Sequence, residues 1–416
     1  MDKTTFTQLF APFDRAGVAP RFRSLRESAR ERFALLPLPT QRSEDWRFTS
    51  IAPITNMPFD LPGKAGECGG VKFSQPSTRD ALRLAFVNGK FEKRLSRLEH
   101  VPSGVQIGSL AEMKADTALL ANIADYRDNA FTALNTGFLS DGAMVVIADG
   151  RTIGPPIEII YLSTSPVKFM THPRTLVVAG KVTQATIIER YLGAGEYFAN
   201  AVTEIALAEH AVVDHVKVQE ESKEAFHVAN TQIVMAARSA FTTHYLSLGG
   251  ALVRNEVRVR FDGEHSEATV NGLYLAAAKQ HIDNFTVIDH AQPNCASHEL
   301  YKGILDGSSH GVFNGKIFVR KDAQKTDAKQ TNKVLLLSDD ATINTKPQLE
   351  IFADDVKCTH GATIGQLDAA QLFYLQSRGI PLDAARRLLT FAFANDIVSR
   401  VNIEAIREEL ESRIMR

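Results

Sequence analysis

Two side chains near the C-terminus, Cys358 and His360, have the types and the spacing that a soft metal site uses. In an extended backbone, residues two apart point to the same face, so this thiol and imidazole would lie together. Both are suitable ligands for iron or zinc, but two ligands cannot close a four-coordinate structural site. A metal site here therefore needs further residues or another chain. The competing interpretation is an inert buried cysteine beside a hydrogen-bonded histidine.

Five further histidines of the strand region are interpreted as structural or surface residues: His227, His244, His281, His290 and His298. No G-x-S-x-G elbow, H-E-x-x-H helix or dinucleotide G-x-G-x-x-G occurs. Asn314-Gly315-Lys316 suggests a phosphate loop, but His310 stands where that motif needs glycine and Ile317 where it needs Ser or Thr. We predict a turn there and no hydrolytic or hydride chemistry.

Composition, charge and cysteine content indicate which partners and which compartment to expect. The chain has 416 residues, 44% of them hydrophobic and 23% charged, and a formal net charge of -1, which disfavours a nucleic-acid partner or an anionic membrane surface. Its three cysteines, Cys68, Cys295 and Cys358, are odd in number and far apart, which fits a reducing compartment. With neither a signal peptide nor a membrane span in the sequence, a cytoplasmic protein is expected.

The elements that must position Cys358 and His360 are strands. From about residue 155 to 365, short runs alternate apolar and polar residues, most clearly Val257, Val259 and Phe261 on one face. Similar runs occur at residues 212–218, 232–235, 268–275, 284–288, 316–319, 333–337 and 348–352. So many strands without helices exceed one ordinary sandwich. A barrel, a double sandwich and a β-solenoid stay open, with a solenoid favoured although no fixed repeat is visible.

Helices are expected at both ends of the chain. Residues 1–40 have helical spacing until Pro37 and Pro39, residues 61–76 suggest a linker, and Asn88-Gly89 indicates a hairpin turn. Near the C-terminus, Asp368 is a good N-cap, Gly379 a good helix end, and Pro381 opens a second helix. The predicted regions are 1–85 (helices and linker), 86–154 (mixed lead-in), 155–365 (solenoid) and 366–416 (helices).

Several motifs occur in an order that resembles the SufB/SufD scaffold family of the SUF iron–sulfur cluster assembly system. They are Glu44-Asp45-Trp46-Arg47-Phe48-Thr49, Ala133-Leu134-Asn135, Asp141-Gly142, Asp289-His290, Pro293, Ser297, Glu299-Leu300-Tyr301-Lys302-Gly303, Phe313-Asn314-Gly315-Lys316, Pro347-Gln348-Leu349-Glu350-Ile351, Asp355-Val356-Lys357-Cys358-Thr359-His360-Gly361-Ala362-Thr363 and Tyr374-Leu375-Gln376-Ser377-Arg378-Gly379-Ile380. The resemblance covers most of the chain.

Two departures favour the D-type (SufD) branch. The B-type pattern has a cysteine in the turn before the P-x-[LI]-E strand, where this chain has Asp339-Asp340-Ala341-Thr342. It also has a glutamate after the histidine of its H-E-A-T segment, where this chain has Gly361. The resemblance therefore implies that a metal-binding set on this chain is reduced to His360, with Cys358 as a second ligand or a wall residue.

The resemblance also implies a fold and partners. It implies a mainly β chain, a right-handed parallel β-helix with helical ends, acting as a non-catalytic scaffold with a SufB-like sibling and a SufC-like ABC ATPase. The ATPase would dock on the C-terminal helices around Phe373, Tyr374, Arg378 and Gly379, although core packing explains the two aromatics equally well. A transient iron–sulfur cluster would lie between subunits, and no cofactor would be held stably by this chain alone.

Some questions stay open at this point. The residues do not address a flavin in the complex, an iron-delivery role or a homodimer of the isolated chain. A solenoid polysaccharide lyase or hydrolase is an alternative, because such enzymes cluster carboxylates on one sheet face and the strand region contains Asp283, Asp289 and Asp306. A purely structural solenoid is another alternative.

Overall fold

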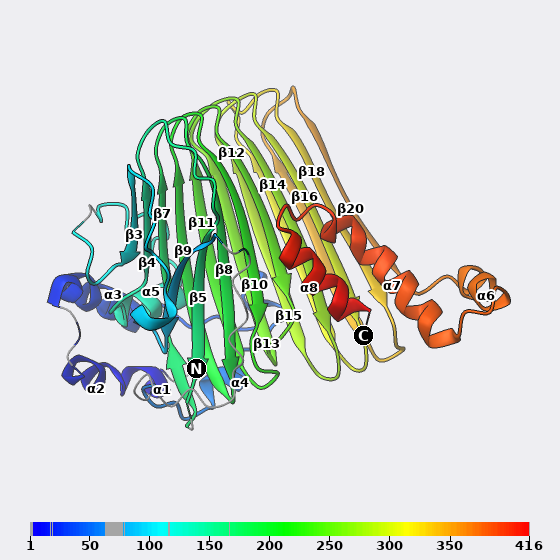
Figure 1. Cartoon of the computed structure of the whole chain (residues 1–416), viewed down its shortest axis with the longest axis horizontal. Coiled ribbons are helices and arrows are strands. Elements are labelled where there is room, and N and C mark those ends of the chain that lie inside the picture. Colours follow the sequence, from blue (N-terminus) through cyan, green and yellow to red (C-terminus); the bar gives the residue numbers. More distant parts are fainter. Residues whose placement is uncertain are drawn as a thin grey trace.

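The structure is a computed structural model that describes residues 3–415 except 17, 19, 63–77, 79, 115, 116 and 166. Its body is a β-solenoid in which successive long strands alternate between two facing sheets (Figure 1). Nearly all the pairings are parallel, so the predicted parallel β-solenoid with helical ends is confirmed. Cys68 and most of the predicted linker lie outside the described residues.

The two sheets are named here by their strand numbers. The even sheet runs in the order β2 (Lys90–Phe91), β1 (Leu82–Val87), β5 (Ile157–Thr164), β8 (Gln184–Ala194), β10 (Val212–Glu220), β12 (Ala240–Ser247), β14 (Glu267–Ala276), β16 (Ala296–Leu305), β18 (Asp327–Leu336) and β20 (Lys357–Gly365). The odd sheet runs in the order β19 (Thr342–Ile351), β17 (His310–Val319), β15 (His281–His290), β13 (Leu252–Phe261), β11 (Phe226–Met235), β9 (Tyr197–Leu207), β7 (Arg174–Ala179), β4 (Ala143–Ile147) and β3 (Val105–Ser109), with β6 (Phe169–Thr171) beside β9. Both sheets thus extend N-terminal to residue 155.

The repeat of the solenoid is close to constant but not fixed. In the even sheet, Val212, Ala240, Glu267, Ala296, Asp327 and Lys357 follow one another in register, which gives steps of 28, 27, 29, 31 and 30 residues. The connections between the strands differ in length, which accounts for the unequal steps. A period that varies by up to four residues explains why no repeat is visible in the sequence alone.

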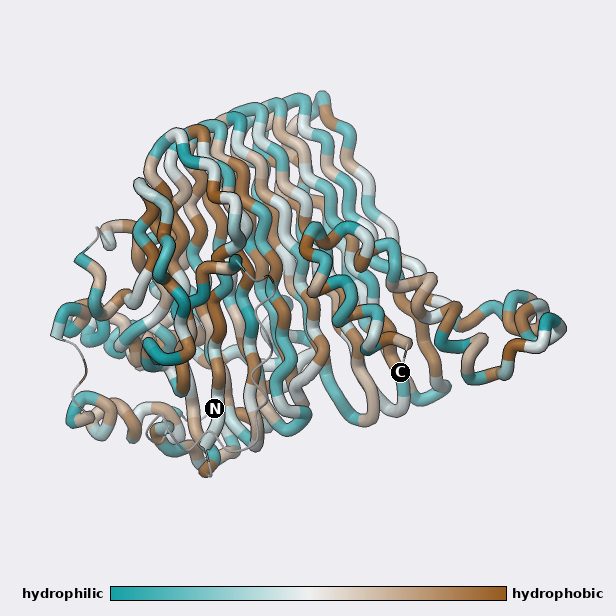
Figure 2. Tube along the Cα trace, viewed as in Figure 1, coloured by the Kyte–Doolittle hydropathy of each residue, from teal (hydrophilic) through white to brown (hydrophobic). Residues whose placement is uncertain are grey.

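The core lies between the two sheets, and strand alternation decides which residues enter it. Val257, Val259 and Phe261 all face inward and are fully buried, as predicted from their spacing. Fully burying one such side chain contributes about 1.5–3 kcal/mol. Figure 2 shows hydrophobic residues recurring along the strands, while hydrophilic residues gather at the turns. The repeated burial therefore stabilises the stack turn by turn.

One sequence prediction is wrong. Asn314-Gly315-Lys316 does not form a turn but lies in the middle of β17. A Cβ atom on Gly315 would lie 2.4 Å from Nε2 of Gln330, whose side chain reaches across from the facing sheet. The glycine leaves room for that side chain and does not make a turn. The Asn88-Gly89 prediction is confirmed, since both residues have positive φ between the antiparallel strands β1 and β2.

The N-terminal region covers the outer face of the odd sheet at one end of the solenoid (Figure 1). Its helices are α1 (Thr4–Thr7), α2 (Phe10–Arg15), α3 (Arg23–Leu35), α4 (Ala52–Thr55) and α5 (Ala130–Gly137), with 3-10 turns at Pro20–Phe22, Glu44–Trp46 and Lys93–Leu95. Phe6, Phe33 and Phe131 from these helices pack against Phe198 of β9 and its neighbours. The helix α3 ends before Pro37, as the sequence predicts.

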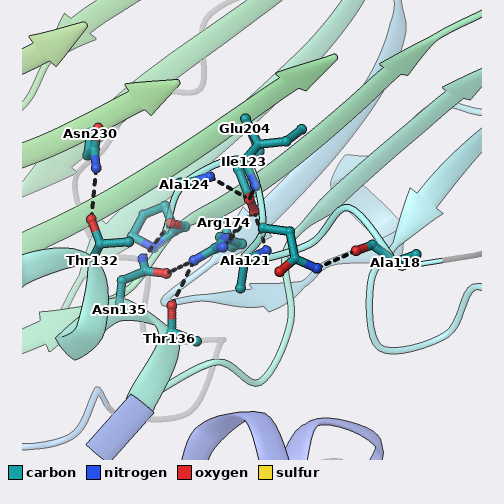
Figure 3. Close-up of polar contacts among 12 residues, drawn as sticks. Ala118, Ala121, Ile123, Ala124, Thr132, Asn135, Thr136, Arg174, Glu204 and Asn230 are labelled. Atoms are coloured by element: carbon teal, nitrogen blue, oxygen red, sulfur yellow. Dashed lines mark hydrogen bonds and ion pairs between the residues drawn. The ribbon is translucent and has the colours of Figure 1, made fainter. Parts of the chain in front are cut away.

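A buried polar cluster ties this region to the odd sheet (Figure 3). Arg174 of β7 pairs with Glu204 of β9, with both side chains fully buried, and Glu204 also accepts backbone N–H groups of the loop before α5. Asn135 of α5 accepts from Arg174 and donates to the carbonyl groups of Pro173 and Asn200. The motif residue Asn135 therefore has a structural role.

The C-terminal helices are α6 (Ala369–Ser377), α7 (Leu382–Val398) and α8 (Glu404–Ile414). The end of α7 and all of α8 cover the outer face of the even sheet, where Ile397, Val398 and Leu410 pack against Val216, Leu273 and their neighbours. In contrast, α6 projects away from the body beyond the last turn of the solenoid (Figures 1 and 2). No residue of α6 is buried, so this helix is not part of the core.

Candidate functional site

The candidate site lies at the C-terminal end of the solenoid, where the stack stops. β19 and β20 are the last strands of the odd and even sheets, and each pairs on one side only. Nearly every residue of β20 is exposed, and none of β19 is fully buried. The inward-facing side chains of these two strands are therefore open to whatever covers this end.

Cys358 and His360 lie on the inward face of β20. Cys358 pairs in register with the buried Ala328 and packs partly against the core, and His360 pairs in register with the buried Gln330. The structure thus places the thiol and the imidazole on one face, as their spacing predicts. Cys358 is half-buried while His360 is exposed.

The two candidate ligands differ electrostatically. Burial raises the pKa of the Cys358 thiol above its ordinary value, so at neutral pH the group is a thiol rather than the thiolate that binds metal. A metal ion would have to displace this proton. His360 is exposed, so its ring does not carry the cost of burial and is accessible to a metal ion. This difference favours His360 as the ligand.

The part of the chain that the structure describes offers no third ligand. Among the residues that the structure describes, no group of three or more His, Cys, Asp or Glu side chains could hold a metal ion. The two remaining inward positions of β20 are Ala362 and Ile364, neither of which can ligate. A metal centre at this end would therefore be incomplete without a second molecule.

The free edges of the two terminal strands are not equivalent. The N–H of Lys357 donates to Thr326, so the odd-numbered residues of β20 bond to β18 and the even-numbered residues face outward. In β19, the N–H groups of Thr342 and Phe352 bond toward β17, so the odd-numbered residues face outward. One of these is Pro347, which has no N–H. The free edge of β19 thus lacks a donor that β20 keeps.

The four predicted docking residues lie on and just after α6. Phe373 and Tyr374 are 73% and 57% exposed, so neither packs in the core of this chain. Arg378 lies over the Tyr374 ring, 5.4 Å from its centroid. Gly379 has φ +84° and donates to Gln376, and Ile380 donates to Leu375, which together make a Schellman end.

The start of α6 is equally well defined, because the Asp368 side chain accepts the N–H groups of Ala370 and Gln371. The predicted N-cap and helix end are thus confirmed, and Pro381 is the N-cap residue of α7. Because both ends of α6 are capped, this short helix keeps its shape although little of it is buried.

The motif around Trp46 also has a structural role. Trp46 is nearly buried and lies under Arg254 of β13, with 4.1 Å between its ring centroid and the guanidinium carbon. The Thr49 hydroxyl donates to Asp283, and Glu44 pairs with Lys346 of β19 at 2.7 Å. The segment of residues 44–49 therefore contacts the odd sheet from β13 to its last strand, β19.

The acidic residues that suggested a carbohydrate-active enzyme do not form a cluster. Asp283 is buried against Arg254, and Asp289 pairs with Arg320 at 2.8 Å. Asp306 lies in the turn after β16 and accepts the N–H of Gly307. Each carboxylate thus has its own structural partner.

Sequence reasoning missed the polar side chains between the sheets. Glu189, His215, Lys217 and Glu221 lie on inward faces and are almost completely buried, and burial lowers the pKa of Lys217 to about 8. Nearer the open end, Gln330 donates to Glu299 at 2.6 Å. The sequence signal that could have indicated them is the alternation of polar with apolar residues within these strands, as at His215, Lys217 and Gln219 of β10.

The chain matches two family models over nearly its whole length. Residues 161–393 match the SUF system FeS cluster assembly SufBD core domain, and residues 3–159 match the SufBD protein N-terminal region. No helix in the described part of the chain is long and apolar enough to cross a membrane.

Curated relatives agree with these models. An iron-sulfur cluster assembly SufBD family protein of Synechocystis is 34% identical over 92% of this chain and 88% of its own length. The iron-sulfur cluster assembly protein SufD of Escherichia coli is 30% identical over 91% and 88%, and SufD of Bacillus subtilis is 27% identical over 70% and 67%. The chain therefore belongs to the SufBD family of the SUF iron–sulfur cluster assembly system, and the D-type resemblance is confirmed.

Proposed function

We propose that this chain is a non-catalytic scaffold subunit of the SUF complex, and that its open solenoid end pairs with a SufB-like sibling. A nascent iron–sulfur cluster, the cargo of the complex, is held across that interface, with His360 as the ligand from this chain. Cys358 forms the wall of the site or a second ligand. The observation that carries this proposal is the uncovered β20, which presents both side chains at an unfinished end of the molecule.

The edge of β20 supports pairing with another chain. Its outward N–H and C=O groups belong to Cys358, His360, Ala362 and Ile364, and no proline interrupts them. Adding a strand here would satisfy these groups and cover the inward side chains at the same time. Cluster ligation would then depend on assembly, because His360 alone cannot hold a cluster.

The projecting helix α6 supports a second contact, with a SufC-like ABC ATPase. A helix of nine residues that shows two aromatic rings to solvent gains little from its own fold, and such rings are frequent anchors of interfaces. The sequence has no phosphate loop, so ATP hydrolysis belongs to the partner. We place this complex in the cytoplasm, with no cofactor held stably by this chain alone.

The test is cluster formation in the co-expressed complex with His360→Ala. Counting iron and sulfide per complex, we expect the variant to lose most of the cluster while the subunits still co-purify. The matched control is His298→Ala, which removes a histidine that faces outward on β16 and should leave the count unchanged. Undiminished cluster formation in His360→Ala would contradict the ligand role.

A further inference from the structure

Three inward-facing residues form a polar row that ends at the candidate ligand. Glu299 of β16, Gln330 of β18 and His360 of β20 are consecutive partners in register across the even sheet. Adjacent strands lie about 4.8 Å apart, so each side chain is within reach of the next. Glu299 and Gln330 are buried, and only the last member of the row is exposed.

Gln330 is held at one end and unpartnered at the other. Its Nε2 donates to Oε2 of Glu299 at 2.6 Å, which fixes the orientation of the amide because a carboxylate oxygen accepts. Its Oε1 has no hydrogen-bond partner among the described residues, although the side chain is only 1% exposed. The amide is confined from the facing sheet by Gly315, where any Cβ atom would clash with Nε2. A buried acceptor therefore stays unused beside the strand of His360.

Leaving a buried acceptor without a hydrogen bond is unfavourable, so Oε1 of Gln330 calls for a partner. A metal-ligating histidine usually donates its second ring N–H to a carbonyl or carboxylate oxygen, which fixes the tautomer and the ring orientation. The exposed His360 ring can turn toward Gln330 once the open end is covered. The unused acceptor of Gln330 and the ring N–H of a ligating His360 would therefore satisfy each other.

We propose that Gln330 is a positioning residue for His360, with Oε1 accepting one ring N–H so that the other ring nitrogen, unprotonated, faces the shared cluster. Glu299 acts one step further back and keeps the amide in that orientation. This inference rests on the proposed function and deepens it, since it names the residues that make His360 a competent ligand. It also gives Gly315 a reason to be glycine.

The test measures binding of Co²⁺ alone, as a spectroscopic probe of the ligand set, to the purified complex with the sibling subunit. Gln330→Met keeps the volume and removes the acceptor, and we expect Co²⁺ affinity to fall about 10- to 100-fold. Gln330→Asn is one methylene too short to span from Glu299 to His360 and should behave in the same way. It serves as the second variant if the first does not fold.

Two further variants separate positioning from packing. Gln330→Glu keeps an acceptor oxygen at the same reach and should retain affinity within about threefold. Asn332→Leu removes an equally buried amide on the same face of β18, but one in register with Ala362, and should also leave affinity nearly unchanged. Retention in Gln330→Glu together with loss in Gln330→Met or Gln330→Asn supports the positioning role.

The outcomes also separate this inference from the proposed function. If His360→Ala abolishes Co²⁺ binding while Gln330→Met and Gln330→Asn bind as the native complex does, the positioning role is wrong and the ligand role stands. If His360→Ala binds Co²⁺ normally, the ligand role itself is wrong. Equal losses in Gln330→Met, Gln330→Glu and Asn332→Leu would mean that the effect comes from packing, which overturns the inference.

Discussion

The two ends of the solenoid are finished in different ways. At the N-terminal end, β2 and β3 pair antiparallel with their neighbours. Phe91 and Leu98 pack against the core cluster that contains the fully buried Leu84 and Phe86. At the C-terminal end, no segment that the structure describes covers β19 and β20 in this way. The open end is therefore the end at which we propose that another molecule pairs.

The largest expected difference between the two ends is in stability. Arg174→Met leaves Glu204 as an uncompensated buried charge near the covered end, so we expect a loss of about 3–5 kcal/mol in the free energy of unfolding. Lys346→Met removes an ion pair to the exposed Glu44 at the open end and should produce no measurable change. Denaturant unfolding of both variants checks this. Equal losses in the free energy of unfolding would mean that the two ion pairs stabilise their ends of the solenoid equally.

A proline in the free edge should break assembly but not the fold. Ala362→Pro removes an N–H that faces outward from β20, so we expect binding to the sibling subunit to weaken at least about 100-fold, with the melting temperature unchanged. The adjacent Thr363→Pro removes an N–H that faces β18 and should lower the melting temperature instead. Isothermal titration and thermal melts separate the two. Normal binding by Ala362→Pro would exclude this edge.

The docking helix should show the next largest effect. The double substitution Phe373→Ala with Tyr374→Ala removes the two exposed rings, and we expect the affinity for the ABC ATPase to fall about 10- to 100-fold without loss of stability. The control is Leu35→Ala on α3, an equally exposed apolar residue far from α6 in Figure 1. A pull-down with a concentration series measures the affinity. An effect of the same size in the control would make the contact nonspecific.

Near the open end, we also expect the stability to depend on pH through the buried Glu299 of β16. Burial raises the pKa of Glu299 from 4.5 to about 7, so the folded chain binds more protons than the unfolded chain between these values. Its contribution to stability is therefore fully present below about pH 4.5 and is lost as the pH rises toward about 7. Glu299→Gln should thus be more stable than the native chain at pH 7.5, by up to about 3 kcal/mol, and similar to it at pH 4.5.

Chemical unfolding at the two pH values checks this prediction. Histidines with lowered pKa, such as His244 and His290, titrate in both proteins and cancel in the difference. A constant difference between Glu299→Gln and the native chain at both pH values would show that Glu299 is ionised in the folded state.

Much of the secondary structure could be predicted from the sequence. Alternation at residues such as Val257 and Val259 predicts the strands, and Asp368 and Gly379 predict both ends of α6, because these signals are local. Which strand ends the stack is not a local property. It depends on the register of more than ten strands, which alternation alone does not fix.

The candidate site was only half predictable for the same reason. Cys358 and His360 share a face by spacing alone, whereas Gln330 and Glu299 reach the same site through register, 30 and 61 residues earlier in the chain. Gly315 was misinterpreted as a turn residue because a glycine that makes room for a facing side chain looks the same in the sequence as one that makes a turn. Packing across the core decides between these meanings.

Amide hydrogen exchange across β20 tests directly whether a second chain completes the C-terminal end of the solenoid. In the isolated monomer, we expect the N–H groups of Cys358, His360, Ala362 and Ile364 to exchange rapidly, because they face solvent. On addition of the sibling subunit, their exchange should slow by at least about 100-fold, with β2 and β3 unchanged. A complex that forms while these four amides keep exchanging rapidly would contradict the account.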